Sequence, residues 1–351
     1  MSRIAEGLVK GLHHITLVTA SERTNRRFYI EVLGLRRVKL SVNQDDIFHR
    51  HLFYGDEKGS SGSVITFFEW PHLVSGQVGL GSPHHLAYAV KDLDALQKWA
   101  AWLKRNGLQV SGPHIIDDRV SIYFRDPDGF LLELTSRIEG SIDVEALKEV
   151  FSEEIEVDGI TQDMRLSLMD HASPLATNAA LLERFLSKTL GLKRIAMREN
   201  PHDRQTVILG FGGEDHDFLR YILKPSIRTG FVGIGSIHHI AVKVESDEDQ
   251  KKIMQTLDSI GVRHSGIIDR FWFKSLYFRD PFGNLLEVAT AGPGYAVDEA
   301  PESLGSKLIL PPWLEPERRR IEEALRLLDE QFPAKWPPMY RPAPEKPEKV
   351  E

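Results

Sequence analysis

The sequence predicts an α+β protein of four βαβββ modules, paired into two cupped mixed β-sheets and followed by a C-terminal helix and a Pro-rich tail. Three observations predict this fold. The stretch "SIYFRDPDGFLLE" returns as "SLYFRDPFGNLLE" 154 residues later, and a His-His pair recurs in "GLHHITLV", "PHHLAYAV" and "IHHIAVKV". Two further segments, "FYIEVLGLRRVK" and "FLSKTLGLKRIA", both close on Leu-Gly-Leu. Self-similarity of this kind indicates one structural unit repeated along the chain.

Each module has the same local order, beginning near residues 11, 83, 164 and 237. In the second, Asp92 can cap a helix whose apolar residues share one face, and Gly107 ends it. The segments "SIYFRD" and "FLLELT" then form a hairpin around Asp-Pro-Asp-Gly, which has the residues that such turns need. In the first and third modules, Gly34 and Gly191 stand at the usual left-handed helix stop.

The modules must pair, because a single four-stranded unit leaves one face and two edges uncovered. We expect an N-terminal domain of two modules at 8–140, a C-terminal domain of two modules at 160–295, and an extension at 296–351. An acidic stretch at 141–159 is the expected linker. The segment "PERRRIEEALRLLDEQF" predicts an amphipathic helix, and six prolines among the last 19 residues predict an extended tail.

Composition excludes several function classes. The chain of 351 residues has no cysteine, so disulfides and thiolate ligands are excluded. A formal charge of -7 gives no basic surface for nucleic acid. No apolar run approaches the roughly 20 residues that span a bilayer, and "MSRIAEGLVKG" lacks the apolar core of a signal peptide. We expect a cytoplasmic protein with no membrane or nucleic-acid partner. Exposed sheet edges commonly pair, which is compatible with a homo-oligomer.

Strand alternation divides the histidines of each pair. His14 shares a face with Thr16 and Val18, whereas His13 shares the other face with Ile15 and Leu17, so only one histidine of a pair points into the cup. The same rule nominates His239 and Glu287. Two imidazoles and one carboxylate on strands leave adjacent metal positions open. This facial arrangement suits Fe(II), with Mn(II) as a close substitute.

A second combination is equally open from the residues alone. His85 and Glu133 of the second module also lie 48 residues apart, as His239 and Glu287 do, and could join His14. The third module begins with "MRLSLM", so we expect it to supply no histidine. A lone strand histidine is more often structural, and a glutamate in an alternating strand often faces solvent. The joint recurrence of both residues favours metal binding instead.

At these residues the chain resembles the vicinal-oxygen-chelate superfamily, which includes glyoxalase I, bleomycin-resistance proteins and extradiol ring-cleaving dioxygenases. Within it, the segments 41–71, 269–290 and 298–316 are similar to the branch of hydroquinone-type ring-cleaving dioxygenases. The resemblance implies the glyoxalase/bleomycin-resistance/dioxygenase fold and one metal ligand from the first module with two from the fourth. It therefore favours His14, His239 and Glu287 over the set with His85 and Glu133.

The resemblance also implies an activity and the residues that assist it. It implies an Fe(II)-dependent dioxygenase that cleaves a hydroquinone or catechol-type ring with O2, as in aromatic compound degradation. His238 or His13 would act as acid or base, Tyr277 as a hydrogen-bond donor, and Arg270 beside developing negative charge. Tyr123 is the counterpart of Tyr277 in the second module, so this tyrosine is alternatively a core residue of the repeat. Two other functions stay open: a glyoxalase-like metal-dependent lyase or isomerase, and a metal-free small-molecule binding protein.

Overall fold

The computed structural model describes residues 5–138, 140, 143–153, 155–200, 203, 205–213 and 216–334. Its elements confirm four modules of the predicted order. The first has β1 (Val9–Thr19), α1 (Glu22–Arg27) continued by a π-helical turn (Phe28–Val32), β2 (Arg36–Asn43), β3 (Asp46–Gly55) and β4 (Val64–Glu69). The second has β5 (His85–Ala89), α2 (Leu93–Arg105), β6 (Ser111–Ile116), β7 (Arg119–Arg125) and β8 (Leu131–Arg137). The third has β9 (Met169–Ser173), β10 (Leu175–Ala176), α4 (Ala179–Thr189), β11 (Lys193–Glu199), β12 (Val207–Gly212) and β13 (Asp217–Leu223). The fourth has β14 (Ile237–Val244), α5 (Asp247–Ser259), β15 (His264–Asp269), β16 (Lys274–Arg279) and β17 (Leu285–Thr290).

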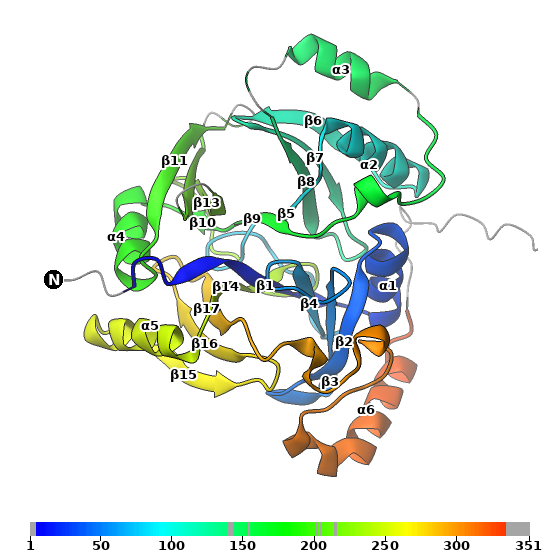
Figure 1. The fold of residues 1–351 in the computed structure, drawn as a ribbon, viewed down its shortest axis with the longest axis vertical. Helices are drawn as coiled ribbons and strands as arrows, with labels where there is room; N and C mark the ends of the chain where they lie inside the picture. Colours follow the sequence, from blue (N-terminus) through cyan, green and yellow to red (C-terminus); the bar gives the residue numbers. More distant parts are fainter. Residues whose placement is uncertain are drawn as a thin grey trace, which may run out of the picture.

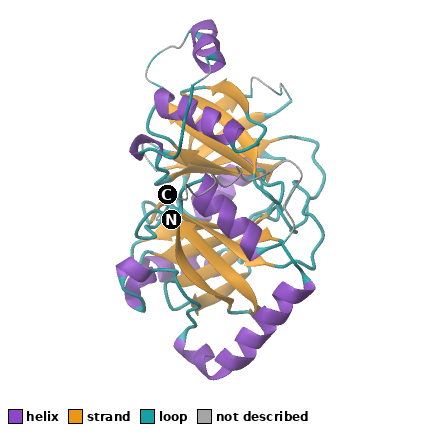
Figure 2. Ribbon diagram, turned by 90° about the vertical axis from the view of Figure 1, so that its right-hand side faces the viewer, coloured by secondary structure: helices purple, strands orange, loops and turns teal. Residues whose placement is uncertain are grey.

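The two sheets each combine one module from each half of the chain. The first sheet has the order β15-β16-β17-β14-β1-β4-β3-β2, and the second β11-β12-β13-β9-β5-β8-β7-β6 with β10 beside β13. Thus the first module pairs with the fourth, and the second with the third (Figure 1). Figure 2 shows the two sheets one above the other. The predicted ranges 8–140 and 160–295 therefore follow the repeat along the chain. Each sheet, in contrast, takes one module from each of the two ranges.

Two connectors between modules lie side by side. The segment after β4 forms isolated bridges to the segment before β14, with Ser75 opposite Ile234 and Leu80 opposite Thr229. The backbones approach closely, because a Cβ atom on Gly79 would lie 2.4 Å from the backbone nitrogen of Gly230. The chain crosses from the first sheet to the second along one connector and returns along the other.

One large core lies between the sheets. It takes apolar side chains from both sheets and from the helices beside them, including Ile15, Leu17, Leu86, Tyr88, Leu96, Trp99, Leu182, Leu186, Ile253 and Leu257. His14 is on the same strand as Ile15 and Leu17 but points to the opposite face, as the strand alternation predicts. The concave faces of both sheets therefore turn away from the shared core.

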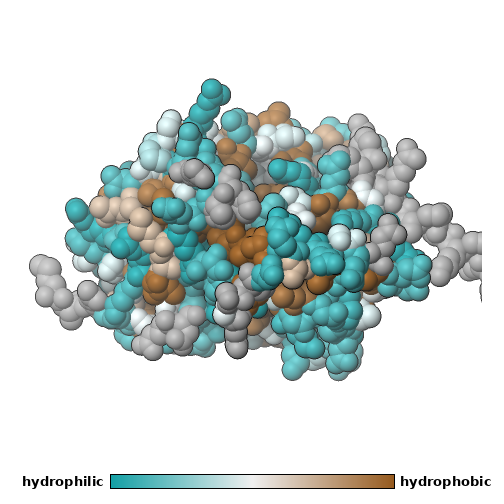
Figure 3. All heavy atoms as spheres, turned by 90° about the horizontal axis from the view of Figure 1, so that it is seen from above, coloured by the Kyte–Doolittle hydropathy of each residue, from teal (hydrophilic) through white to brown (hydrophobic). Residues whose placement is uncertain are grey.

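Local signals explain the helix boundaries. The Asp92 side chain accepts a hydrogen bond from the backbone N–H of Ala95, so the predicted cap of α2 is confirmed. The predicted linker contains a further helix, α3 (Val144–Ser152), capped by Asp143. None of the described helices is long and apolar enough to cross a membrane. Hydrophilic side chains cover most of the face shown in Figure 3, and the apolar ones form small separate patches.

The C-terminal extension packs on the first sheet. The predicted helix is confirmed as α6 (Arg318–Gln331), and its Ile321 and Leu325 pack against Val42 of β2 and Leu310. Before it, Tyr295 and Leu304 enter an apolar cluster on the concave side of the sheet. The predicted Pro-rich tail lies outside the described residues from 335 onward.

Candidate metal centre

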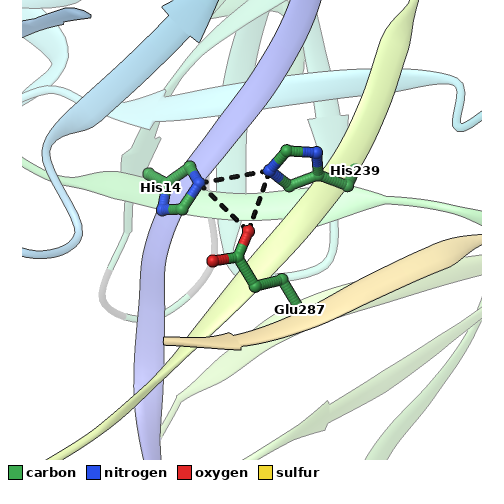
Figure 4. A group of neighbouring side chains, drawn as sticks. All are labelled: His14, His239 and Glu287. Carbon is green, nitrogen blue, oxygen red and sulfur yellow. Dashed lines mark hydrogen bonds and ion pairs between the residues drawn. The ribbon is translucent and has the colours of Figure 1, made fainter. Parts of the chain in front are cut away.

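Three neighbouring strands of the first sheet bring two imidazoles and one carboxylate together. His14 lies on β1, His239 on β14 and Glu287 on β17, and all three side chains are buried. The Nε2 atoms of His14 and His239 are 3.2 Å apart. Glu287 Oε2 lies 3.3 Å from His14 Nε2 and 2.9 Å from His239 Nε2 (Figure 4). The predicted combination therefore converges on one point.

The surroundings of these atoms fit a divalent cation. Ser275 Oγ donates to Glu287 Oε1 at 2.6 Å, which leaves Glu287 Oε2 facing the two histidine nitrogens. Behind the histidines, the Nδ1 atoms of His13 and His14 are 2.9 Å apart, and those of His238 and His239 are 2.8 Å apart. Each of the three residues is thus oriented from behind and turns one possible ligand atom to the common point, as metal ligands require.

The electrostatics agree with this arrangement. Burial alone would raise the pKa of Glu287, but His14 and His239 hold it well below its usual range. Burial lowers the pKa of His239. An ionised carboxylate and a neutral imidazole are the protonation states in which these groups bind metal ions.

A cavity of about 450 Å³ opens in front of the three ligand groups. Its walls combine aromatic side chains with histidines and with polar and charged side chains, among them Asn43, Gln44, Asp45 and Asp46. The lining includes His14, His51, Phe53, Phe68, Trp70, His238, His239, Ser265, Arg270, Trp272, Phe273, Tyr277 and Leu285. A concave site in which aromatic side chains surround a cluster of polar groups is typical of small-molecule binding.

The sequence analysis missed His51. This buried histidine on β3 lines the cavity, and its Nε2 lies 2.9 Å from Thr66 Oγ1, which in turn lies 2.7 Å from Thr16 Oγ1. Burial, and then the nearby His14, hold the pKa of His51 well below its usual value. Strand alternation offered a signal, because His51 shares a face with Phe53, which is in the concave cluster.

His13 and His238, the other histidine of each pair, have different positions. His238 lines the cavity, whereas His13 is not one of the described residues that line it. The His13 ring packs on Phe273 with ring centres 5.0 Å apart. Burial lowers the pKa of both His13 and His238 to about 3, with a smaller contribution from the adjacent histidine. Both rings are therefore neutral at physiological pH.

Arg270 and Tyr277 stand together on the cavity wall. The guanidinium carbon of Arg270 lies 5.6 Å from the centre of the Tyr277 ring. Asp45 holds the guanidinium through two contacts, of 2.7 and 3.1 Å. Burial, and then the Glu287 carboxylate, raise the pKa of the Tyr277 phenol, so that it stays protonated. The cavity thus brings together His238, Arg270 and Tyr277 with the three candidate ligands.

The alternative combination of His14 with His85 and Glu133 is not formed. His85 and Glu133 belong to the second sheet, and the buried group there is completed by His171 on β9. The expectation that the third module supplies no histidine was wrong, because its first strand is Met169–Ser173 and not "MRLSLM". The repeat carried the missing signal, since Gly34 and Gly191 lie 157 residues apart, and so do His14 and His171.

Several known proteins are similar to this chain in sequence, in fold or in both. The family model of the Glyoxalase/Bleomycin resistance protein/Dioxygenase superfamily matches residues 11–134 and 169–288. The "Putative ring-cleaving dioxygenase MhqA" of Bacillus subtilis is 33% identical over 91% of this chain and 98% of its own. "Chlorohydroquinone/hydroquinone 1,2-dioxygenase" of Sphingobium indicum is 26% identical over 88% of this chain and 93% of its own.

A crystal structure of a "putative dioxygenase" from Bacillus subtilis superimposes with a TM-score of 0.77 at 31% identity, covering 90% of this chain and 96% of that one. Glyoxalase I from Zea mays shares the fold, with a TM-score of 0.59 at 16% identity over 80% of this chain and 92% of its own. The chain therefore belongs to the glyoxalase/bleomycin resistance protein/dioxygenase superfamily.

Proposed function

We propose that this protein is a ring-cleaving dioxygenase that incorporates both atoms of O2 into a hydroquinone or catechol-type aromatic. Fe(II), with Mn(II) as a substitute, would be held by His14, His239 and Glu287. The observation that carries the proposal is the buried group of two imidazoles and one carboxylate at the base of an aromatic-lined cavity. The names of the ring-cleaving relatives favour this chemistry over the lyase, isomerase and binding-protein alternatives.

The metal would supply open positions for the ring oxygen and O2 and lower the pKa of a bound phenol. The chain would supply the walls that select a flat ring. Phe53, Phe68 and Trp272 line the cavity and would shield the faces of a bound ring from water. Aromatic side chains favour offset or edge contacts with another ring, which restricts how the substrate enters.

His238 is the best candidate for moving a proton. If His239 binds the metal through Nε2, its Nδ1 carries the proton, and this N–H donates a hydrogen bond to His238 Nδ1, 2.8 Å away. The single proton of neutral His238 then lies on Nε2, from which it could hydrogen-bond a substrate oxygen. His13 has the same relationship to His14 but does not line the cavity, so we propose it as a positioning residue.

Tyr277 and Arg270 would stabilise negative charge that develops on the ring. Tyr277 is protonated and can donate, and Arg270 is fixed beside it by Asp45. Fixed donors in an enclosed site act more strongly than in water because they need no reorganisation. His51 on β3, hydrogen-bonded to Thr66, would add a neutral polar group to the cavity wall. The cytoplasmic location and the homo-oligomer stay predictions.

The test is anaerobic reconstitution of metal-free protein with Fe(II), followed by oxygen uptake with a panel of catechols and hydroquinones. We expect uptake of one O2 per ring cleaved. The ring-opened product should appear at the same time as a new absorbance. Absence of oxygen uptake with every diol tested would contradict the proposal. Turnover of an α-oxo substrate without oxygen would instead favour the lyase or isomerase alternative.

A further inference from the structure

We propose that the second sheet holds a second divalent transition-metal site, formed by His85, Glu133 and His171. These residues lie on β5, β8 and β9, and all are buried. Glu133 Oε2 lies 2.9 Å from His85 Nε2 and 3.4 Å from His171 Nε2. Two imidazoles and one carboxylate suit a first-row divalent cation. The site shares no residue with the centre in the first sheet and does not depend on the proposed function.

The groups behind these residues orient them as metal ligands. Ser121 Oγ donates to Glu133 Oε1 at 2.6 Å, which leaves Oε2 toward the histidines. The Nδ1 atoms of His84 and His85 are 2.7 Å apart, so His85 turns its Nε2 inward. Ser275 and His238 give Glu287 and His239 the same two supports in the first sheet, and the one exception lies behind the third ligand.

The exception is Asp170, which lies behind His171 where His13 lies behind His14. Its Oδ1 is 2.7 Å from His171 Nδ1, and the buried Arg119 holds the same oxygen through Nε at 2.9 Å. A carboxylate that orients a histidine from behind is a recurrent feature of metal sites, because it fixes the tautomer and strengthens the ligand.

The position between these residues calls for a positive charge. His171 Nε2 and His85 Nε2 face the same Glu133 oxygen at 3.4 and 2.9 Å, and all three side chains are buried. Asp170 adds a second carboxylate behind His171. A divalent cation among these atoms or an extra proton on His171 would balance the two carboxylates. The experiment below separates the two.

The site also has room for further ligands. A cavity of about 240 Å³ opens beside it, smaller than the cavity of the first sheet. Ser173 lies in its lining, with Oγ 3.2 Å from His85 Nε2. Thr16, the counterpart of Ser173, instead bonds Thr66, so a hydroxyl beside the ligand atoms is particular to the second site. Water or a small ligand in this cavity would complete the coordination.

The test counts metal ions in the full chain. Protein stripped with a chelator is reloaded with excess Mn²⁺, freed of unbound ion and measured by elemental analysis. We expect two ions per chain in the wild type, and one each in His171→Ala, Glu133→Gln and His14→Ala. His114→Ala is the matched control, because His114 lines the second cavity without belonging to the triad, and it should keep two ions.

The outcomes separate this site from the first. One ion that is lost in Glu133→Gln but kept in His14→Ala still supports the second site, while it removes the ligand set of the proposed function. One ion that is kept in Glu133→Gln and lost in His14→Ala overturns the second site and assigns the extra charge to a proton. Glu133→Gln preserves shape, so it serves if His171→Ala does not fold, as circular dichroism would show.

Discussion

His14 Nε2 lies 3.2 Å from His239 Nε2, although 225 residues separate the two histidines in the chain. The distance is short because β1 and β14 are antiparallel neighbours at the centre of the first sheet. The candidate metal centre therefore exists only when the first and last modules pair. His85, which is in a similar sequence context, lies in the other sheet.

Replacing His239 with alanine should remove the proposed activity. Loss of a metal ligand should reduce Fe(II)-dependent oxygen uptake by more than about 100-fold, because losing even an outer partner typically costs 10- to 100-fold. His85→Ala is the matched control and should keep most of the activity, measured with the same diol. If His85→Ala alone abolished uptake, the proposed ligand set would be wrong.

Tyr277→Phe tests whether this tyrosine assists the reaction or only fills the repeat. Tyr277 lines the first cavity, and its counterpart Tyr123 lines the second. Loss of a fixed donor near developing charge should lower kcat by at least about 10-fold. Tyr123→Phe removes the same hydroxyl in the other sheet and should leave kcat unchanged. Equal kcat values for the two variants would assign Tyr277 a structural role.

Lys39→Met should destabilise the first sheet strongly. The fully buried Lys39 ammonium donates to Asp298 at 2.6 Å and to the buried Glu299 at 2.5 Å, which ties the C-terminal extension to β2. Removing one partner of a buried pair leaves an uncompensated charge, which costs about 3–5 kcal/mol of the free energy of unfolding.

Urea unfolding would measure this loss. Lys148→Met is the control, because Lys148 and its partner Glu145 are both exposed, and such pairs contribute about 0–1 kcal/mol. A loss in Lys39→Met no larger than in Lys148→Met would show that the extension is held by its apolar contacts alone.

Gly79→Ala should loosen the two connectors between the sheets. The added Cβ would lie 2.4 Å from the backbone nitrogen of Gly230, and backbone cannot yield as a flexible side chain does. We expect a loss of about 1–3 kcal/mol, as for other overpacked positions, seen as a lower Tm. Gly213→Ala is the control, since a Cβ there has no described neighbour within 4 Å. An equal Tm for the two variants would contradict the close approach.

The modules could be read from the sequence because their signals are local. The Asp92 cap, the Asp-Pro-Asp-Gly turn and the helix stop at Gly34 each act within a few residues. Strand alternation likewise separated His14 from His13, because the side-chain period is fixed by the backbone. The start of β9 was misread, since its short strand "MDHAS" has no apolar alternation to mark it.

The sequence by itself determined the four modules and which side chains could face a concave surface. Only the tertiary structure decided which modules share a sheet, and hence that His14 meets His239 and Glu287 while His85 meets Glu133 and His171. The physical reason is that the local pattern is the same in every module, so this pattern alone does not select which first strand pairs with β1. The choice depends on contacts between distant segments, such as the paired connectors at Gly79 and Gly230 and the shared core between the sheets.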